Sequence, residues 1–342
     1  VRMRILVTGG CGYIGSHTLV DLLQDDYEVL CLDNLSRGAE KILSGVEQIT
    51  GKQIQNHNID LCDADATRNF FQLHKPDAVI HFAAYKSVGE SVEQPLLYYH
   101  NNIASMVNLL SCVQEFDVKH FVFSSSCSVY GNLKTQPVNE LTPLGAAISP
   151  YGHSKQIGED MIRHFSKICS TRFVMLRYFN PVGAHPSALI GEIPFGKPSN
   201  LVPAITQSAA GILPAIVVHG NDYPTADGTC VRDYIHVCDI ARAHKLALNL
   251  CSTMNVNENP FIMNLGSGNG NTVLEVIDAF EKSTGVKLNY SIGPRRHGDV
   301  DVIYSNNQLA KEKLGWQAEY SLADMMQSAW QWQLHLNIMN TK

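Results

Sequence analysis

The sequence lacks the patterns that define several common protein classes. Its nine cysteines are odd in number and scattered, and no two form a Cys-x-x-Cys pair, so we expect neither a disulfide framework nor a metal site. No apolar run approaches the roughly 18 residues of a membrane-spanning helix, and no signal-peptide architecture precedes the first apolar segment at Ile5. We therefore expect a cytosolic protein from a reducing compartment.

Basic runs, internal repeats and low-complexity segments are missing as well. The formal net charge is −6, and no polybasic tail is present, which argues against nucleic acid or an anionic membrane as a partner. With 45% hydrophobic and 17% charged residues, the 342-residue chain has the composition of a globular protein with one large or two moderate domains.

A strand, a glycine turn and a helix open the chain. Residues 4–8 form an apolar strand, Gly9, Gly12 and Gly15 follow at three-residue spacing, and residues 16–23 have helical periodicity. Such glycines allow a tight turn, close approach of a pyrophosphate and packing of the helix on the strand, with the phosphate at the helix N-terminus. The pattern predicts a dinucleotide site.

The second predicted strand, residues 28–32, ends at Asp33. An acid at this distance from the glycine turn binds both hydroxyls of an adenosine ribose, which favours NAD over NADP. The nearby Arg37 is the one counter-signal, because a 2′-phosphate would attract it.

Alternating strands and helices continue through residues 55–61, 66–74 and 78–84, and this order predicts a Rossmann-type, doubly wound parallel sheet. Helices are expected at 94–116 and 151–168. Both carry apolar residues on more than one face, which permits a subunit contact.

Proline and glycine become frequent after Asn180, which predicts long loops and a second, smaller α/β region. We expect a dinucleotide-binding domain at 1–180, with a returning segment near 231–250, and a substrate-binding domain at 181–342. In this second part the patterns predict strands at 231–237 and 261–265, a helix at 273–284 opened by a Thr272–Glu275 capping box, and a helical tail at 306–338.

The chemistry is expected between residues 121 and 155. An apolar strand ends at Ser126, and Tyr151 and Lys155 follow at a spacing that places both on one helix face. An ammonium close to the phenol is expected to lower the tyrosine pKa from about 10 toward about 7. Such a shift needs roughly 4 kcal/mol, and one cation at about 4 Å contributes a similar amount. Tyr151 is thus predicted to be a base.

Several ordered strings resemble the extended short-chain dehydrogenase/reductase family, and within it the UDP-hexose 4-epimerases. They are TGGCGYIGSH at 8–17, LDNL at 32–35, HFAAYKSVGES at 81–91, RYFNPVGAHP at 177–186 and GNDYPT at 220–225. The resemblance implies NAD as cofactor, a UDP-hexose as substrate and a homodimer formed through the two helices named above.

The resemblance also implies the site residues. The NAD site comprises Gly9, Gly12, Tyr13, Ile14, Gly15, Asp33, Asn34, Asp60, Leu61, Phe82, Ala83, Lys86, Asn101, Tyr151, Lys155 and Tyr178. The UDP-sugar site comprises Ser126, Tyr151, Asn180, Asn200, Leu201, Val217, His219, Arg232, Arg296, Asp299 and Ile303. The guanidinium groups of Arg232 and Arg296 suit a diphosphate on chemical grounds too, although surface salt bridges are the alternative.

The expected reaction is oxidation at sugar C4 to a 4-keto intermediate, followed by return of the hydride to the opposite face. Tyr151 removes the 4-hydroxyl proton, Ser126 donates a hydrogen bond to the same oxygen, and Lys155 holds the tyrosine and the nicotinamide ribose.

Two positions depart from the family pattern. His219 stands where an aromatic residue often contacts uracil, and Ile303 is intermediate in size at the position that borders the sugar C2 substituent. N-acetylated UDP-hexoses are therefore possible substrates beside UDP-glucose and UDP-galactose.

Two alternatives stay open. The first is a related dehydratase or decarboxylase, which carries acidic residues directly after the active-site hydroxyl. This chain has Cys127 and Ser128 there, and these residues cannot act as the acid and base of an elimination. A catalytically silent NAD-binding scaffold would have no reason to keep the tyrosine, lysine, serine and arginines together.

Overall fold

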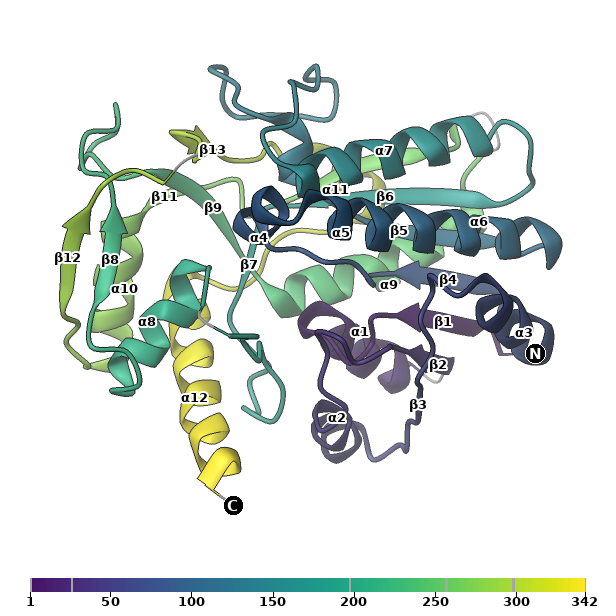
Figure 1. The fold of residues 1–342 in the computed structure, drawn as a ribbon, viewed down its shortest axis with the longest axis horizontal. Helices are drawn as coiled ribbons and strands as arrows, with labels where there is room; N and C mark the ends of the chain where they lie inside the picture. Colours follow the sequence, from purple (N-terminus) through teal and green to yellow (C-terminus); the bar gives the residue numbers. More distant parts are fainter. Residues whose placement is uncertain (1, 26, 197, 256–257, 297–298, 342) are drawn as a thin grey trace.

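The computed structural model describes residues 2–25, 27–196, 198–255, 258–296 and 299–341. Its main sheet has seven parallel strands in the order β10-β6-β5-β4-β1-β2-β3 (Figure 1). These strands are β1 (Arg4–Thr8), β2 (Glu28–Leu32), β3 (Asn56–His57), β4 (Ala78–His81), β5 (His120–Ser126), β6 (Arg172–Tyr178) and β10 (Phe261–Leu265). The strand order reverses beside β1, as in the Rossmann-type fold predicted.

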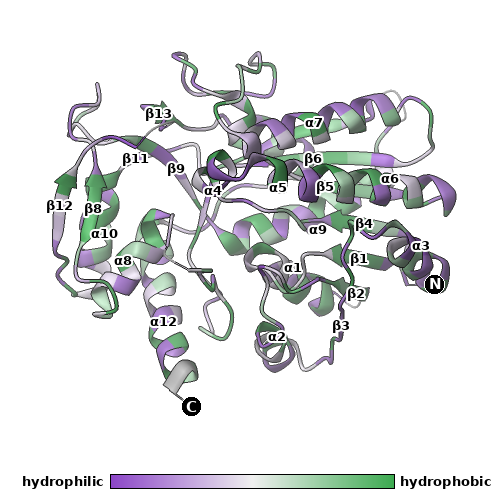
Figure 2. Cartoon of the chain, in the orientation of Figure 1, coloured by the Kyte–Doolittle hydropathy of each residue, from purple (hydrophilic) through white to green (hydrophobic). Residues whose placement is uncertain are grey.

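Helices cover both faces of this sheet because successive strand residues point to opposite sides. In β1, Ile5 and Val7 pack in the core cluster that includes α1, α2 and α9, whereas Leu6 packs in the cluster that includes α3, α6 and α7. Strands β1 and β4 are strongly hydrophobic (Figure 2), as expected for buried parallel strands. The six helices are α1 (Tyr13–Gln24), α2 (Ile42–Thr50), α9 (Val237–Thr253), α3 (Ala64–His74), α6 (Ser105–Glu115) and α7 (Pro150–Phe165).

The helix predicted at 94–116 is present, but a π-helical turn interrupts it. Helix α4 (Val88–Glu93) precedes α5 (Pro95–Tyr99), and the π turn at His100–Ala104 leads directly into α6. Such turns often occur at functional sites. This one contains the candidate cofactor residue Asn101.

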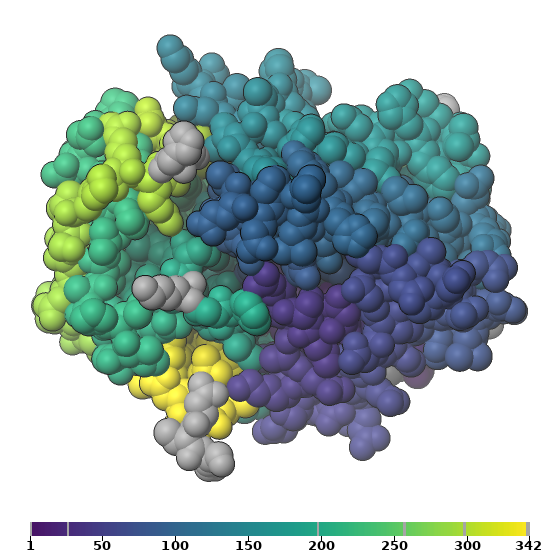
Figure 3. Space-filling view, in the orientation of Figure 1, coloured from purple at the N-terminus to yellow at the C-terminus, as the bar shows by residue number. Residues whose placement is uncertain are grey.

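In the second region, two small sheets pack with helices α8 (Leu201–Ala209), α10 (Val273–Thr284) and α12 (Leu322–Thr341). Strand β9 (Val231–His236) pairs with β7 (Asn180–Val182), β11 (Gly270–Thr272) and β13 (Val302–Ile303), and β8 (Ile216–His219) pairs with β12 (Tyr290–Gly293). The capping box is confirmed, since the Thr272 and Glu275 side chains each accept the backbone N–H of the other residue. In Figure 3 these C-terminal residues lie on one side of the molecule and the N-terminal residues on the other.

The prediction of one helical tail at 306–338 was wrong. Helix α11 (Gln308–Leu314) stops at Gly315, whose φ of 62° ends the helix, and α12 begins only at Leu322. Between them Trp316 is fully buried and donates its indole N–H to the Asp239 carbonyl at 2.8 Å. Within the described residues, no helix is long and apolar enough to cross a membrane.

Candidate active site

The glycine loop packs so tightly that side chains are excluded. Gly9 has φ of 71°, and a Cβ there would lie 2.8 Å from the backbone N of Ala83. A Cβ on Gly15 would lie 2.2 Å from the Gly9 carbonyl oxygen, and one on Gly12 3.1 Å from the same atom. The loop therefore holds the N-terminus of α1 open at the carboxyl edge of the sheet, where a phosphate is stabilised.

Asp33 lies at the same edge, at the end of β2. Its carboxylate accepts the backbone N–H groups of Cys11 at 3.1 Å and Leu35 at 2.8 Å, so it joins the glycine loop to its own turn. Burial raises the pKa of Asp33, and the two backbone bonds oppose this rise. Arg37 donates instead to Glu90 at 2.6 Å, which makes this arginine part of an ion pair.

Further candidate cofactor residues meet beside the π turn. Asp60 accepts the backbone N–H of Cys62 at 2.8 Å, and the Cys62 thiol donates to the Asn101 carbonyl at 3.7 Å. This contact places the turn containing Asp60 and the buried Leu61 against Asn101. Asn34 follows Asp33 in the turn after β2.

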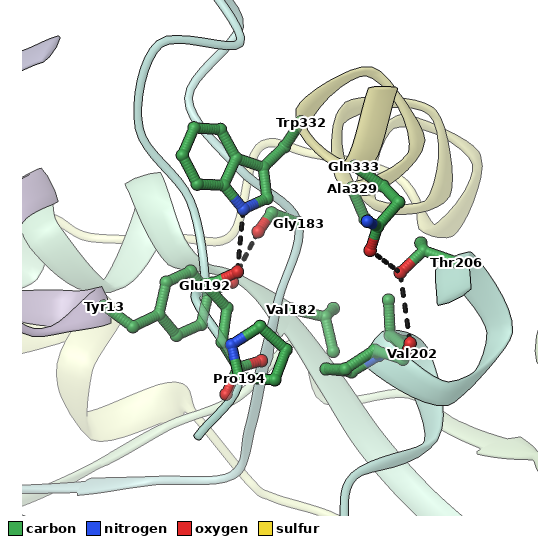
Figure 4. A pocket seen from close by; sticks show the side chains of 11 residues that line it. Tyr13, Val182, Gly183, Glu192, Pro194, Val202, Thr206, Ala329, Trp332 and Gln333 are labelled. Carbon is green, nitrogen blue, oxygen red and sulfur yellow. Dashed lines mark hydrogen bonds between the residues drawn. The ribbon is translucent and has the colours of Figure 1, made fainter. Parts of the chain in front are cut away.

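A loop of the second region reaches the glycine loop. Lys86 donates to Glu192 at 2.8 Å, and the Tyr13 hydroxyl donates to the Gly183 carbonyl at 2.5 Å. Trp332 in α12 donates its indole N–H to the Glu192 carbonyl at 2.7 Å (Figure 4). The pocket drawn there encloses about 20 Å³, which suits one water molecule and is far too small for a dinucleotide. Ile14, next to Tyr13, packs on the main core.

Tyr178 is held by a histidine from the returning helix α9. Its hydroxyl lies 2.8 Å from Nε2 of His244, whose Nδ1 lies 2.9 Å from the Ile240 carbonyl oxygen. Burial lowers the pKa of His244 to about 4, so the ring is neutral near pH 7 and Nδ1 carries its proton. Phe82 packs on the same ring at 4.5 Å, which brings two candidate cofactor residues together.

The candidate catalytic residues converge where β5 ends and α7 begins. Ser126 Oγ accepts the backbone N–H and the hydroxyl of Ser128 at 3.2 and 2.9 Å, so Ser126 can donate its own hydroxyl proton to another acceptor. Ser149 caps α7 and thereby fixes its first turn, which contains Tyr151. Lys155, one turn later, donates to the Ser124 carbonyl at 2.6 Å.

The predicted lowering of the tyrosine pKa is not found in the protein alone. Burial raises the pKa of Tyr151 to about 12, opposed by a hydrogen bond with Ser126, and burial lowers that of Lys155 to about 7. The Lys155 ammonium lies 6.0 Å from the centroid of the Tyr151 ring. Desolvation is the largest cause of both shifts.

A buried ion pair supports this arrangement from behind. Glu159, one turn after Lys155, accepts two bonds from Arg177 at 2.8 and 2.6 Å and one from the Ser125 hydroxyl at 2.6 Å. These bonds tie α7 to β5 and β6, and the carboxylate opposes the fall in the pKa of Lys155.

The candidate diphosphate residues form one cluster. Asp299 lies 3.6 Å from Arg232 and 3.2 Å from Arg296, so one carboxylate holds both guanidinium groups. Arg232 is mostly buried and Arg296 half exposed, so the alternative of simple surface salt bridges fits only in part. Asn180 Oδ1 is buried and has no hydrogen-bond partner among the described residues, as suits a ligand-binding group.

The remaining substrate candidates lie around this cluster. Arg296 also donates to the Ser199 carbonyl at 3.1 Å, which places it beside Asn200 and Leu201 at the start of α8. His219 contacts the Pro294 carbonyl through Nδ1 at 3.3 Å, whereas Val217 is exposed on β8.

Ile303 is buried next to the catalytic strand end. It pairs with Arg232 in the register of β13 and β9, and its core cluster includes Phe179 and the partly buried Cys127. Its side chain therefore lies close to neighbours of both Ser126 and Asn180.

Sequence reasoning missed the residues that support the site. Glu192 contacts Lys86 and His244 contacts Tyr178, in each case from a distant part of the chain. Glu159 contacts Arg177 and lies on α7, four residues after Lys155, so it continues the Tyr151–Lys155 spacing. That repeated four-residue spacing was the one local sign of a supporting residue.

Fold and site together define an extended short-chain dehydrogenase/reductase. The family model described as GDP-mannose 4,6 dehydratase matches residues 6–329. The chain is 47% identical to the UDP-glucose 4-epimerases of Drosophila melanogaster and Bacillus subtilis, over 96% and 97% of its length and the same shares of theirs. It belongs to the family of the UDP-glucose 4-epimerases.

Solved structures of this family superpose closely. The UDP-glucose 4-epimerase of Stenotrophomonas maltophila, with bound NAD and formylated UDP-arabinopyranose, is 45% identical with a TM-score of 0.95, covering 99% of this chain and 100% of that one. The Bifidobacterium longum enzyme, in complex with NAD+ and UDP, is 43% identical with a TM-score of 0.93, covering 97% and 98%. The UDP-Glc/GlcNAc 4-epimerase of Campylobacter jejuni is 37% identical with a TM-score of 0.84, covering 97% and 99%.

Proposed function

We propose that this protein interconverts UDP-galactose and UDP-glucose with NAD as a retained cofactor. The observation that carries the proposal is the meeting of Tyr151, Lys155 and Ser126 at the carboxyl edge of the sheet, with the glycine loop and the arginine cluster in the same structure. Bound NAD would supply the acceptor and donor of the hydride that sugar C4 loses and regains. Gly9, Gly12 and Gly15 would admit its pyrophosphate, and Asp33 would bind its adenosine ribose.

The chain supplies the proton transfer. Tyr151 takes the proton of the 4-hydroxyl and returns it, and Ser126 donates a hydrogen bond to the same oxygen while keeping its own proton. Lys155, one turn after Tyr151 on α7, would stabilise the phenolate because a positive charge nearby favours the ionised phenol. Inversion requires the 4-keto sugar to turn its opposite face toward the nicotinamide. Arg232 and Arg296 would therefore hold the nucleotide tightly, while the sugar is bound weakly enough to rotate.

We propose that N-acetylated UDP-hexoses are also accepted. Ile303, which is intermediate in size, is buried beside the strand end, and the family includes the UDP-Glc/GlcNAc enzyme of Campylobacter jejuni. Turnover of UDP-galactose without any turnover of UDP-N-acetylgalactosamine would contradict this broader substrate range.

A dehydratase activity is not favoured despite the description of the family model. Cys127 and Ser128 follow Ser126, and burial raises the pKa of Cys127 to about 12, so neither residue serves as the acid and base of an elimination. A silent scaffold would not need the buried Glu159–Arg177 support of Lys155.

We further propose a homodimer in the cytoplasm, with the two-domain division expected near residue 180. Exposed apolar side chains on α4, α5 and α6 support the dimer, and nine free cysteines support a reducing compartment.

The test is to incubate purified protein with UDP-galactose, without added cofactor, and to follow UDP-glucose. Tyr151→Phe should lower turnover by at least about 100-fold, because the base is lost, while NAD released on denaturation stays unchanged. A 4-keto-6-deoxy product would favour the dehydratase, and unchanged turnover of the variant would favour a different base.

A further inference from the structure

Tyr223 carries a buried hydroxyl without a partner. The residue is 4% exposed, and its hydroxyl has no hydrogen-bond partner among the described residues. A buried hydroxyl without such a bond disfavours folding, so its presence needs an explanation.

The tyrosine ring is fixed in place from two sides. A Cβ on Gly220 would lie 2.6 Å from Cε2 of Tyr223, so only glycine permits this packing. The Arg295 guanidinium covers the ring at 3.9 Å from its centroid and donates to Asp222 at 2.7 Å. The hydroxyl therefore has a defined position.

Tyr223 packs on the face of β9 that carries Arg232, a residue of the candidate diphosphate cluster. It shares one buried cluster with Cys230 and Tyr234, the residues two before and two after Arg232, and alternate residues of a strand lie on one face. Burial raises the pKa of Tyr223, the Asp299 carboxylate raises it further, and Arg232 opposes the rise. The phenol is thus a neutral donor at physiological pH.

We propose that Tyr223 donates a hydrogen bond to a diphosphate oxygen of the nucleotide sugar, beside Arg232 and Arg296. The inference rests on the proposed function, since it concerns the same substrate. A phosphate oxygen is the acceptor that two guanidinium groups attract, and it would satisfy the buried Tyr223 hydroxyl, which has no partner among the described residues.

The experiment compares Tyr223→Phe with Tyr290→Phe by titration calorimetry against UDP and uridine. Tyr290 is 45% exposed on β12, which makes it a matched control. Tyr223→Phe should raise the Kd for UDP about tenfold and leave the Kd for uridine unchanged, because uridine has no phosphate. The ligand-free variant should melt at the same or a higher temperature, because an unpaired buried hydroxyl is removed.

An unchanged Kd for UDP, an equal loss for uridine, or a lower melting temperature would each overturn the proposal. A wild-type protein that binds UDP but forms no UDP-glucose would instead contradict the proposed function alone.

Discussion

At the scale of the residue, burial decides the charge of the candidate catalytic pair, Tyr151 and Lys155. Lys155 and Tyr151 were recognised from their spacing, but the direction of the tyrosine pKa shift was wrong. Spacing along a helix says that two side chains share a face, whereas desolvation depends on how many atoms from other elements surround them. Around Lys155 those atoms come from β5, through Ser124 and Phe123.

The lowered pKa of Lys155 predicts that this residue reduces the stability of the folded protein although turnover requires it. Its folded-state pKa, about 7, lies below the unfolded value near 10.5, so the unfolded chain binds more protons between pH 7 and 10.5. Lys155→Met should abolish turnover yet raise the free energy of unfolding at pH 7, by at most about 5 kcal/mol and less after loss of the Ser124 bond. Urea unfolding at several pH values measures this.

The increase in the free energy of unfolding of Lys155→Met should become smaller as the pH rises from 7 to past 10.5, because Lys155 is then neutral in the folded and the unfolded state. Lys282→Met, at an exposed lysine of α10, is the control and should change stability by less than about 0.5 kcal/mol. A lower free energy of unfolding for Lys155→Met at pH 7 would contradict the lowered pKa of Lys155.

At the scale of the element, regular patterns were predicted well and their interruptions poorly. The strands of the main sheet and the capping box at Thr272 follow from local periodicity and capping chemistry. The π turn at 100–104 was missed because nothing in its sequence departs from a helix. Its Asn102 bonds to the Tyr85 backbone and to Ser154, both tertiary contacts.

The glycine loop allows a matched pair of substitutions. Gly15→Ala should lower stability by roughly 1–3 kcal/mol and prevent retention of NAD, because the new Cβ would lie 2.2 Å from the Gly9 carbonyl oxygen. Gly89→Ala in α4 meets no atom within 4 Å and should stabilise the protein by roughly 0.5–1 kcal/mol. Thermal melts and NAD released on denaturation measure both. Similar behaviour of the two variants would contradict the tight packing of the loop.

At the scale of the whole molecule, an apolar surface remains on the outer helices. Val92, Leu96 and Val107 are 52%, 80% and 46% exposed on α4, α5 and α6. These helices include the segment that the resemblance assigns to the dimer contact. Burial of such side chains between subunits would remove their apolar area from water.

We expect a solution mass near twice 37.8 kDa by light scattering. Leu96→Glu with Val107→Glu should shift it toward the monomer, because two charges would be buried at the contact. Ile212→Glu, at an exposed site of the second region, should leave the mass unchanged. A dimer that persists in the double variant would place the contact elsewhere.

The sequence alone determined the class of fold, the cofactor loop, Asp33 and the pair Tyr151 and Lys155, because each depends on residues within a few turns of one another. The tertiary structure alone decided which groups support them. Asp299 joining Arg232 to Arg296, His244 reaching Tyr178 and Glu192 reaching Lys86 depend on how the second region folds back on the first. Contacts over such separations leave no local periodicity, and the pKa of a buried group depends on the same packing.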